Sequence, residues 1–438
     1  MSEHFEVLAE HYFLSENYLK SADYSKLASR KAEKAASFND AIAYAKKRVI
    51  SLEKLTWADE LDKQIIDART VLGLYMAQMN YLNEAKEAIN PIIDLAIKHD
   101  YKRRLCQIYT ILGAYYWFVE DNYPEIFKAF EEALKISEEV KDIVSFVLAS
   151  YWFGCALGCN CEFERSANYF QKALNINVSA KNLWGIANTK SSLAYASYWY
   201  HGRIDLQFET SKEGLQIAEE SGDIYSKAMA YVSHGTSCYG KGLPEEAEEY
   251  LLKGFEFCKR INFTSWDAMA LYHLGDIYFE MGNFQRSKEH YEKGALVFEC
   301  NRLFPSWVGF GKVASTRSKV MDKERDVNLE SLYAHLRNNK VKAAEGWIQR
   351  YIGEILLNID DQHLSEAEHW IQKAIEADQR NGMMFHLGKD YAAYADLFKR
   401  KGDRSKAQEN LGKAIEILKE CGADGWVEKY EKELATLS

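Results

Sequence analysis

A small residue recurs about every 40 residues through most of this chain. Six of the seven successive separations are 40 residues and the other is 41. A repeat of this length favours a solenoid, in which each unit packs on its neighbours, over one compact core. The residues are Ala133, Ala173, Gly214, Gly254, Gly294, Ala334, Ala374 and Ala414.

The sequence around these positions predicts a pair of antiparallel helices in each repeat. Both LGAYYWFVEDNYPEIFKAFEEALKI, from Leu112, and LGDIYFEMGNFQRSKEHYEKGALVF, from Leu274, carry an apolar–small pair, an aromatic residue and a polar turn. Only 4 of the 438 residues are proline, which favours a nearly all-helical protein. We expect the recurrent small residues where adjacent helix pairs cross, and larger ones such as Phe130 and Phe170 between the layers.

The repeat resembles the tetratricopeptide repeat. The period is near 40 residues instead of about 34, and the initial Trp and final Pro of that family are mostly missing. The resemblance implies an all-α fold, a right-handed α-α superhelix (a tetratricopeptide-like solenoid) of about nine or ten helix pairs. The best matches are Leu112-Gly113-Tyr116, Phe153-Gly154, and Leu274-Gly275-Tyr278 with Gly282 and Tyr291.

Both ends of the chain resemble the C-terminal tails of bacterial signalling proteins that join an adenylate/guanylate cyclase to an AAA or STAND ATPase. The similar segments are residues 8–55 and 402–434. The resemblance implies a helical segment at 1–58, a repeat array at 59–421 and a capping helix at 422–438. It also implies that the chain regulates such an ATPase or cyclase, although neither of those modules is present in this sequence.

Charge and composition exclude some functions. The net charge of −10 and the pI near 5.7 argue against nucleic-acid binding, which needs a concentrated basic surface. The first residues show no signal peptide, and the uncharged stretch 143–161 contains Gly154 and Gly158 in repeat register, which disfavours a membrane span. The eight cysteines lack a disulfide framework, so we expect a cytoplasmic protein.

Three cysteines crowd into one repeat, at Cys155, Cys159 and Cys161. One interpretation is a metal or redox site, for which His201 at the next turn is the candidate fourth ligand. The other interpretation, which we favour, is that Cys155 and Cys159 line the inner face of a first helix while Cys161 occupies a turn. We therefore predict no metal and no cofactor.

No pattern in the sequence indicates catalysis. The segment VGFGKVAS, from Val308, lacks the spacing of a phosphate-binding loop and falls where the register requires a first helix. No paired-histidine zinc motif occurs, and His234 and His273 fit packing or groove lining better than catalysis. We expect a protein that is not an enzyme.

The first helices of the repeats are the best candidates for a binding surface, because they line the concave side of such solenoids. Their aromatic residues are suited to anchoring a protein, a peptide or a small ligand, and charged residues continue the surface. The alternative is that many of these rings only pack between repeats. The candidates are Trp117, Tyr151, Tyr195, Tyr198, Trp199, Tyr239, Tyr272, Phe279, Lys312, Arg350 and Lys389.

Three functional hypotheses follow from the sequence. The preferred one is a non-enzymatic protein-interaction or ligand-sensing module, the regulatory tail of a signalling ATPase or cyclase. The second is a stand-alone peptide-binding adaptor or co-chaperone, and the third is a metal or redox protein using the cysteine cluster. We expect no nucleic-acid and no membrane partner.

Overall fold

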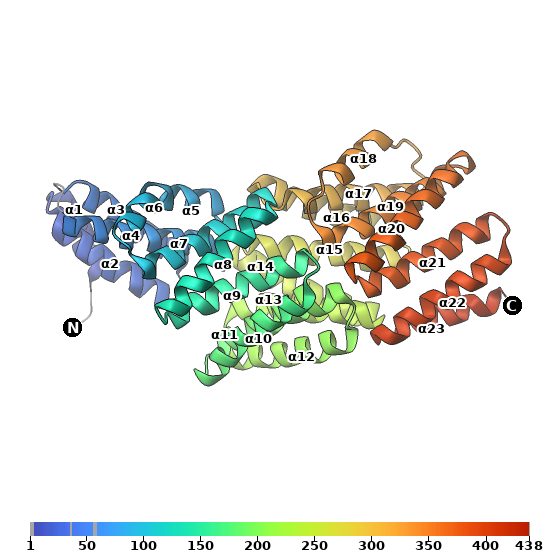
Figure 1. Ribbon diagram of the computed structural model, residues 1–438, viewed down its shortest axis with the longest axis horizontal. Helices are drawn as coiled ribbons and strands as arrows, with labels where there is room; N and C mark the ends of the chain where they lie inside the picture. The colour runs from blue at the N-terminus through green and yellow to red at the C-terminus, as the bar shows by residue number, and fades with distance from the viewer. Residues whose placement is uncertain (1–3, 36, 56–58, 438) are drawn as a thin grey trace. The chain divides into compact units, whose positions relative to one another are not determined.

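The computed structural model describes residues 4–35, 37–55 and 59–437, and they form helices joined by short turns (Figure 1). No strand occurs in these ranges. The prediction of an all-α, tetratricopeptide-like helical solenoid is confirmed. No helix among the described residues is long and apolar enough to cross a membrane.

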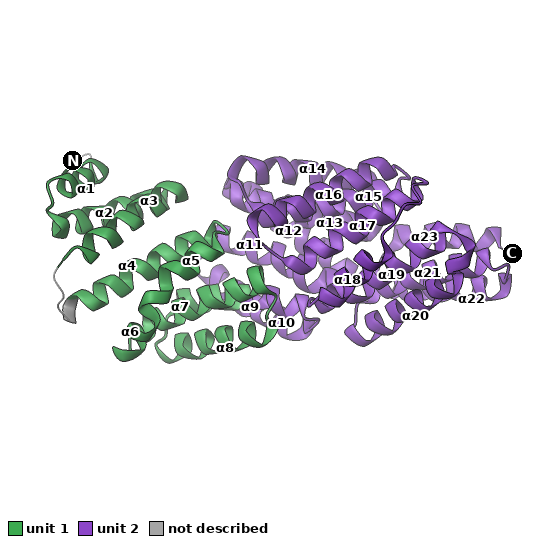
Figure 2. Cartoon of the chain, turned by 90° about the horizontal axis from the view of Figure 1, so that it is seen from above, with its two compact units in different colours: residues 1–152 green, residues 153–438 purple. Residues whose placement is uncertain are grey.

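The chain divides into two compact units, residues 1–152 and 153–438, which are coloured separately in Figure 2. The sequence did not predict this division. The predicted boundary at 58/59 falls on residues outside the described ranges, whereas α23 lies within the predicted capping segment 422–438.

Unit 1 begins with three helices and continues into the first helix pairs. A one-turn 3-10 helix, η1 (Asn90–Ile92), separates α5 from α6, and a π-helical turn, η2 (Tyr116–Glu120), ends the helix α7. The helix α9 contains the boundary between the units. The helices are α1 (Phe5–Leu14), α2 (Tyr18–Lys34), α3 (Phe38–Glu53), α4 (Asp59–Gln78), α5 (Leu82–Ile89), α6 (Ile93–Lys98), α7 (Lys102–Tyr115), α8 (Tyr123–Glu139) and α9 (Ile143–Cys159).

Unit 2 holds the longest regular series of pairs, in which α11 to α22 alternate as first and second helices. A π-helical segment, η3 (Leu193–Trp199), extends α11, and a 3-10 turn, η4 (Asp361–His363), precedes α20. The helices are α10 (Phe163–Ser179), α11 (Leu183–Ser192), α12 (Ile204–Ser221), α13 (Ile224–Lys241), α14 (Pro244–Ile261), α15 (Thr264–Glu280), α16 (Phe284–Asn301), α17 (Pro305–Met321), α18 (Leu329–Asn338), α19 (Lys342–Ile359), α20 (Leu364–Asn381), α21 (Met384–Arg400), α22 (Arg404–Cys421) and α23 (Asp424–Thr436).

The recurrent small residues lie on the second helices, and seven of the eight are buried. The three glycines among them, Gly214, Gly254 and Gly294, face the first helix of their own pair. A Cβ added at Gly254 would lie 2.7 Å from Val232 Cγ2, and one at Gly294 would lie 2.7 Å from Tyr272 Cε1. The prediction that they serve the crossing between adjacent pairs is therefore wrong for these positions, because the closest approach is within a pair.

A second contact fixes each pair from the other side. The glycine of the apolar–small pair on the first helix accommodates the large residue of the second helix. A Cβ added at Gly154 would lie 3.0 Å from the ring of Phe170, and one at Gly275 would lie 3.0 Å from the ring of Tyr291. In these pairs, therefore, a small residue of each helix packs against a large residue of the other helix.

The pair α17/α18 departs from this pattern. The second helix α18 is only 10 residues long, and Ala334 in it is half-buried instead of buried. The first helix α17 packs directly on the next first helix, α19. The register therefore persists in the sequence at a place where the second helix is shortened.

Gly254 and Gly214 occupy the same position in the repeat, but an added Cβ would have closer neighbours at Gly254 than at Gly214. We therefore expect alanine to have opposite effects on stability at the two positions. Alanine adds about 1 kcal/mol of helix propensity at either site. At Gly254 the new methyl would also meet the Val232 backbone nitrogen at 2.9 Å, so we expect Gly254→Ala to lower the free energy of unfolding by about 1–2 kcal/mol.

At Gly214 the nearest atom would be Lys190 Cβ at 3.3 Å, so we expect Gly214→Ala to be neutral or to stabilise by up to about 0.5 kcal/mol. Urea unfolding of both variants measures the difference. Equal effects of the two substitutions would contradict the within-pair crossing.

Candidate functional site

The interior of unit 2 is built from polar and charged side chains on its first helices. In otherwise apolar helices these residues recur three or four positions apart, as in His273, Asp276 and Glu280 on α15, and such spacing places them on one helix face. We call the set the interior network. It consists of His273, Asp276, Glu280, Arg317, Arg350, Tyr351, Glu354, Asp378, His386, Lys389 and Asp390.

The carboxylate of Asp276 is the hydrogen-bond centre of one half of this network. It accepts from the hydroxyls of Tyr291 at 2.5 Å and Tyr351 at 2.9 Å, and its second oxygen lies 3.3 Å from His273 Nδ1. His273 Nε2 in turn lies 2.9 Å from the hydroxyl of Tyr195 in η3. A buried carboxylate with this many partners fixes α15, α16, α19 and η3 relative to one another.

Arg317 of α17 is a second charged residue of the interior network. Its guanidinium forms an ion pair with Glu354 and lies between two rings, 3.4 Å from the centre of Phe279 and 4.2 Å from that of Tyr351. Planar guanidinium groups stack on aromatic faces in this way, which offsets the loss of water around a buried charge.

Arg350 and Asp390 form a fully buried ion pair. Arg350 Nη1 donates to Asp390 Oδ1 at 2.7 Å and to the carbonyl of His386 at 3.1 Å. A second carboxyl group, that of Asp378, lies within hydrogen-bonding reach of Asp390, and neither of its oxygens has another donor among the described residues. It rests on Gly346, where an added Cβ would collide with the Asp378 carboxyl group.

One cation therefore faces two buried carboxyl groups. Burial, together with the charge of Asp390, raises the pKa of Asp378 well above its usual range. Burial likewise raises the pKa of Asp390, against the opposing effect of Arg350. Asp390 is the partner of Arg350, so Asp378 is the more readily protonated of the two, and its proton is the one that the two carboxyl groups would share.

Glu280 joins three helices that are far apart in the sequence. Its two oxygens accept from Lys389 of α21 at 2.8 Å and from Lys429 of α23 at 2.7 Å. Burial alone would raise the pKa of Glu280, but the two ammonium groups hold it well below its usual range. Burial lowers the pKa of Lys389 to about 8, an effect that Glu280 opposes. Lys389 also lies 3.5 Å from the ring centre of Trp426.

An aromatic cluster covers the inner end of the network. The buried indole of Trp199 packs against Phe385 and His386. The ring centres of Trp347 and His386 are 4.2 Å apart. Burial, followed by the charge of Arg350, lowers the pKa of His386 well below its usual range, so its imidazole is neutral. Within the described part of the chain, the ring nitrogens Trp199 Nε1, Trp347 Nε1 and His386 Nε2 have no hydrogen-bond partner.

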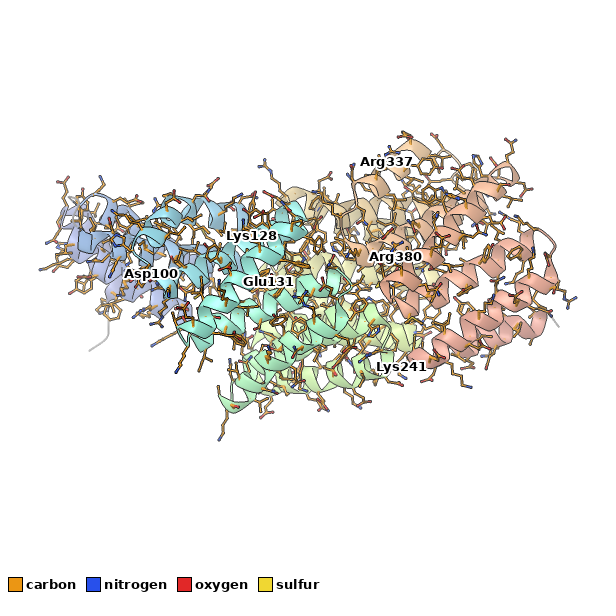
Figure 3. All side chains as sticks on the ribbon, in the orientation of Figure 1. Asp100, Lys128, Glu131, Lys241, Arg337 and Arg380 are labelled. Atoms are coloured by element: carbon orange, nitrogen blue, oxygen red, sulfur yellow. The ribbon has the colours of Figure 1, made fainter. Side chains whose placement is uncertain are left out.

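Direct contacts join α13 to the C-terminal end of unit 2. Trp426 Nε1 donates to the carbonyl of Tyr239 at 2.9 Å, across 187 residues. Lys241, labelled in Figure 3, donates to the carbonyl of Gly422 and to Asp424, both at 2.7 Å. We call these contacts between α13 and α23 the seam.

The backbones themselves approach closely at the seam. Gly242 has a φ of 77°, and an added Cβ there would lie 2.8 Å from the Cα of Gly425. Only glycine fits both the left-handed backbone and the short distance at this position.

Two cavities lie on either side of Glu280 and Tyr239, which line both. The inner cavity, about 10 Å³, holds about one water molecule and is lined by Tyr239, Glu280, Arg317, Trp347, Arg350, Tyr351, Phe385, His386 and Lys389. The second, which we call the seam pocket, is about 180 Å³ and is lined by Tyr239, Gly242, Pro244, Glu280, Met281, Gly425, Trp426 and Lys429. Met281 and Lys429 are exposed, so the seam pocket is open to solvent.

The predicted binding residues separate into several groups. Those that the structure brings together in the interior of unit 2 are Tyr195, Trp199, Tyr239, Phe279, Arg350 and Lys389. They are buried or half-buried and contact one another or the network, so they pack between repeats as the alternative interpretation holds. Their role in binding stays a prediction.

The other candidates lie elsewhere. Tyr272 packs inside the α15/α16 pair and donates to the carbonyl of Trp307 at 2.8 Å. Tyr198 is half-buried, and Lys312 is exposed and pairs with Glu299. Trp117 and Tyr151 belong to unit 1, where both pack against the ring of Trp152.

Much of the site is not predicted by the sequence, notably Glu280, Trp347, Asp378, Trp426 and Lys429. One signal could have found part of it: charged residues three or four positions apart within the apolar first helices. His273 was assigned to packing or groove lining, but its neighbours Asp276 and Glu280 continue the same face. No local signal marks Trp426, because its contacts are with a helix about 190 residues away.

The cysteines follow the favoured interpretation. Cys155 and Cys159 are buried in α9, and Cys161 takes the left-handed turn after it with a φ of 63°. Burial raises the pKa of Cys155 far above its usual range, which disfavours the thiolate that binds metals. Within the described ranges no group of three or more His, Cys, Asp or Glu side chains is placed to hold a metal ion.

Comparison with known proteins supports the repeat assignment. Residues 268–296, in α15 and α16, match the tetratricopeptide repeat family model. No curated protein matches the sequence.

Solved structures share the fold at low sequence identity. A Rap protein complexed with competence and sporulation factor has a TM-score of 0.56 at 16% identity, covering 89% of this chain and 99% of its own. The Rap conjugation gene regulator of plasmid pLS20, in complex with the Phr* peptide, has a TM-score of 0.55 at 17% identity, covering 82% and 95%. These similarities show the fold alone.

A STAND protein with a tetratricopeptide repeat sensor from Pyrococcus horikoshii is also similar. It has 15% identity, a TM-score of 0.42, and coverage of 94% of this chain and 74% of its own. That score is too low to support the predicted signalling context, which stays a prediction.

The shared proton predicts how stability depends on pH. Because the folded state raises the pKa of Asp378, its contribution to stability is complete below about pH 4, the unfolded pKa, and is lost as the pH rises through the folded pKa. The amide introduced by Asp378→Asn keeps a donor toward Asp390 without this titration. We expect the stability of Asp378→Asn relative to wild type to rise by about 2 kcal/mol between pH 4 and pH 8.

Thermal unfolding across that pH range measures the effect, with the exposed Asp396→Asn on α21 as the control that leaves the profile unchanged. Asp390→Asn removes the partner of Arg350 and should instead cost about 3–5 kcal/mol at neutral pH. Parallel pH profiles for Asp378→Asn and wild type would rule out the shared proton.

Proposed function

We propose that the chain is a non-enzymatic binding module that holds a segment of a partner protein, or a peptide, at the seam pocket of unit 2. The observation that carries the proposal is the pocket itself, which is open, walled by Tyr239, Met281 and Trp426, and floored by the charged Glu280. Concave sites of this size with apolar walls and a few polar groups are where ligands usually bind.

The fold supports the same conclusion. Helical repeats of this type bind extended partners, and the two Rap proteins of similar fold were each solved with a bound factor or peptide. The interior of unit 2 is already filled by its own aromatic and charged residues, so the seam pocket offers the available anchoring position. A large side chain buried there would supply most of the binding energy, as a central anchor does in other interfaces.

Binding at the seam would also affect the rest of unit 2. The pocket is made by α13, α14 and α15 on one side and the C-terminal helix α23 on the other, so an occupant contacts helices far apart in the sequence at once. A ligand that fits one arrangement of the seam better than another shifts the population toward it. This is how the module would report binding to an attached partner.

The resemblance of residues 8–55 and 402–434 to signalling tails gives the wider context of the proposal. We expect that the module regulates a cytoplasmic ATPase or cyclase, as those tails do. The charged side chains Arg317, Arg350 and Lys389 of the network are engaged in ion pairs that hold the helices, which supports a structural role for them.

Filling the pocket tests the proposal. Met281 lines it and is exposed, so Met281→Trp should occupy the space without disturbing the core. Leu296→Trp adds the same side chain at an exposed site on α16 outside the pocket and serves as the matched control. We expect peptides selected by phage display on the wild-type chain to lose at least about tenfold in affinity for Met281→Trp and to bind Leu296→Trp normally.

Fluorescence polarisation with the selected peptides gives both affinities. The proposal would be wrong if no peptide is enriched, or if the enriched peptides bind both variants equally well.

A further inference from the structure

The carboxylate of Glu280 is a strong cation receptor that the chain fills with two of its own lysines. Its side chain is 16% exposed and both oxygens accept from an ammonium group. A carboxylate held so firmly in its ionised form remains a charged partner for whatever cation occupies the site.

The two lysines are held to different degrees. Lys389 is 10% exposed and lies 3.5 Å from the ring centre of Trp426, enclosed between Glu280 and that ring. Lys429 is 48% exposed and lies 5.0 Å from the same ring, and among the described residues it forms an ion pair only with Glu280. An exposed lysine loses side-chain entropy in its pair and gains little from it, so Lys429 is the cation that another can replace.

Acidic residues follow or precede several lining residues of the seam pocket in the sequence. Glu245 and Glu246 follow the lining residue Pro244 in the first turn of α14, and both are exposed with no cationic partner in the described ranges. Glu428 precedes Lys429 on α23 and is exposed as well, and it forms an ion pair with Lys432. Together with the net charge of −10, these residues favour the approach of a cation over that of an anion.

The remaining walls set the size and polarity of the occupant. A cavity of about 150 Å³ with apolar walls is large enough to bind benzene. The seam pocket, at about 180 Å³, therefore accommodates a ring or a branched aliphatic side chain against Tyr239, Pro244, Met281 and Trp426. An indole face also attracts cations directly.

We infer that the seam pocket binds a basic segment of the partner, in which a lysine or arginine stands next to an aromatic or large aliphatic residue. The apolar side chain fills the pocket, and the cation takes the place of Lys429 on Glu280 beside Trp426. Lys429 acts as an internal competitor that occupies the cation position when no partner is present. The inference rests on the proposed function and specifies the chemistry of its ligand.

The inference predicts that removing Lys429, the internal competitor, strengthens the binding of a basic ligand. The probes are acetyl-Phe-Lys-amide and acetyl-Phe-Glu-amide, titrated into the full chain carrying 13C-methyl methionine. The chain has 9 methionines, and the Met281 signal is assigned by its loss in Met281→Leu. We expect Lys429→Ala to bind the lysine probe about threefold more tightly than wild type, because the exposed pair no longer competes. Lys293→Ala, which removes an exposed lysine on α16 outside the pocket, should bind it as wild type does.

Glu280→Gln should lose most affinity for the lysine probe, and its circular dichroism and thermal unfolding show whether it is folded. If it unfolds, the Lys429→Ala result decides alone. Weaker binding of the lysine probe by Lys429→Ala would overturn the inference. Preferential binding of the glutamate probe through Lys429 would also overturn it and would assign an acidic ligand.

The inference and the proposed function can fail separately. If selected peptides bind wild type but not Met281→Trp, while carrying no basic residue, the binding site stands and its assigned chemistry is wrong. If neither probe shifts Met281 and no selected peptide depends on the pocket, both are wrong.

Discussion

The ion pair between Glu280 and Lys389 is the interaction on which the interior of unit 2 depends. It joins α15 to α21 across 109 residues, and Lys429 of α23 completes it from a third helix. A buried carboxylate without a cation costs several kcal/mol, so these helices must stay together once the chain places Glu280 between them. The same need for a partner holds for the buried ion pairs Arg317–Glu354 and Arg350–Asp390.

This constraint explains why first-helix aromatic residues such as Trp199 and Phe385 pack against each other in the interior. Charges in the interior require low exposure and complete pairing, and rings such as Trp199, Phe385 and Trp426 exclude water around them. Beside these groups lie a cavity for about one water molecule and the open seam pocket. The proposed binding function lies at the seam, where α13 and α23 meet and where the charged pair borders solvent.

The fold was largely predictable from the sequence, because its signals are local. The helix pair that recurs every 40 residues and the turn at Cys161 were predicted, and the structure has both, whereas Phe170, predicted between the layers, packs on Gly154 of its own pair. The direction of one contact was wrong: the recurrent glycines face their own first helix. Spacing alone fixes where a small residue stands along a helix, but not which of two neighbours it touches.

The site was predictable only in part, because its contacts are non-local. Tyr239, Arg350 and Lys389 were identified as first-helix residues, but nothing in a periodic pattern shows that Lys389 reaches Glu280 or that Trp426 reaches the carbonyl of Tyr239. Those contacts depend on small differences in the packing angle of each successive pair, which accumulate along the repeat series. A charged residue within an apolar helix is the useful sign, since it requires a partner that the local sequence does not supply.

A double-mutant cycle between Glu280 and Lys389 tests the central claim most directly. The free energy of unfolding is measured by urea denaturation for wild type, Glu280→Gln, Lys389→Met and the double variant. If the pair holds the interior closed, each single variant leaves a buried charge poorly paired, and the coupling energy should be at least about 2 kcal/mol. Effects that add to within about 0.5 kcal/mol would contradict the account, because they would mean that the two helices do not depend on this contact.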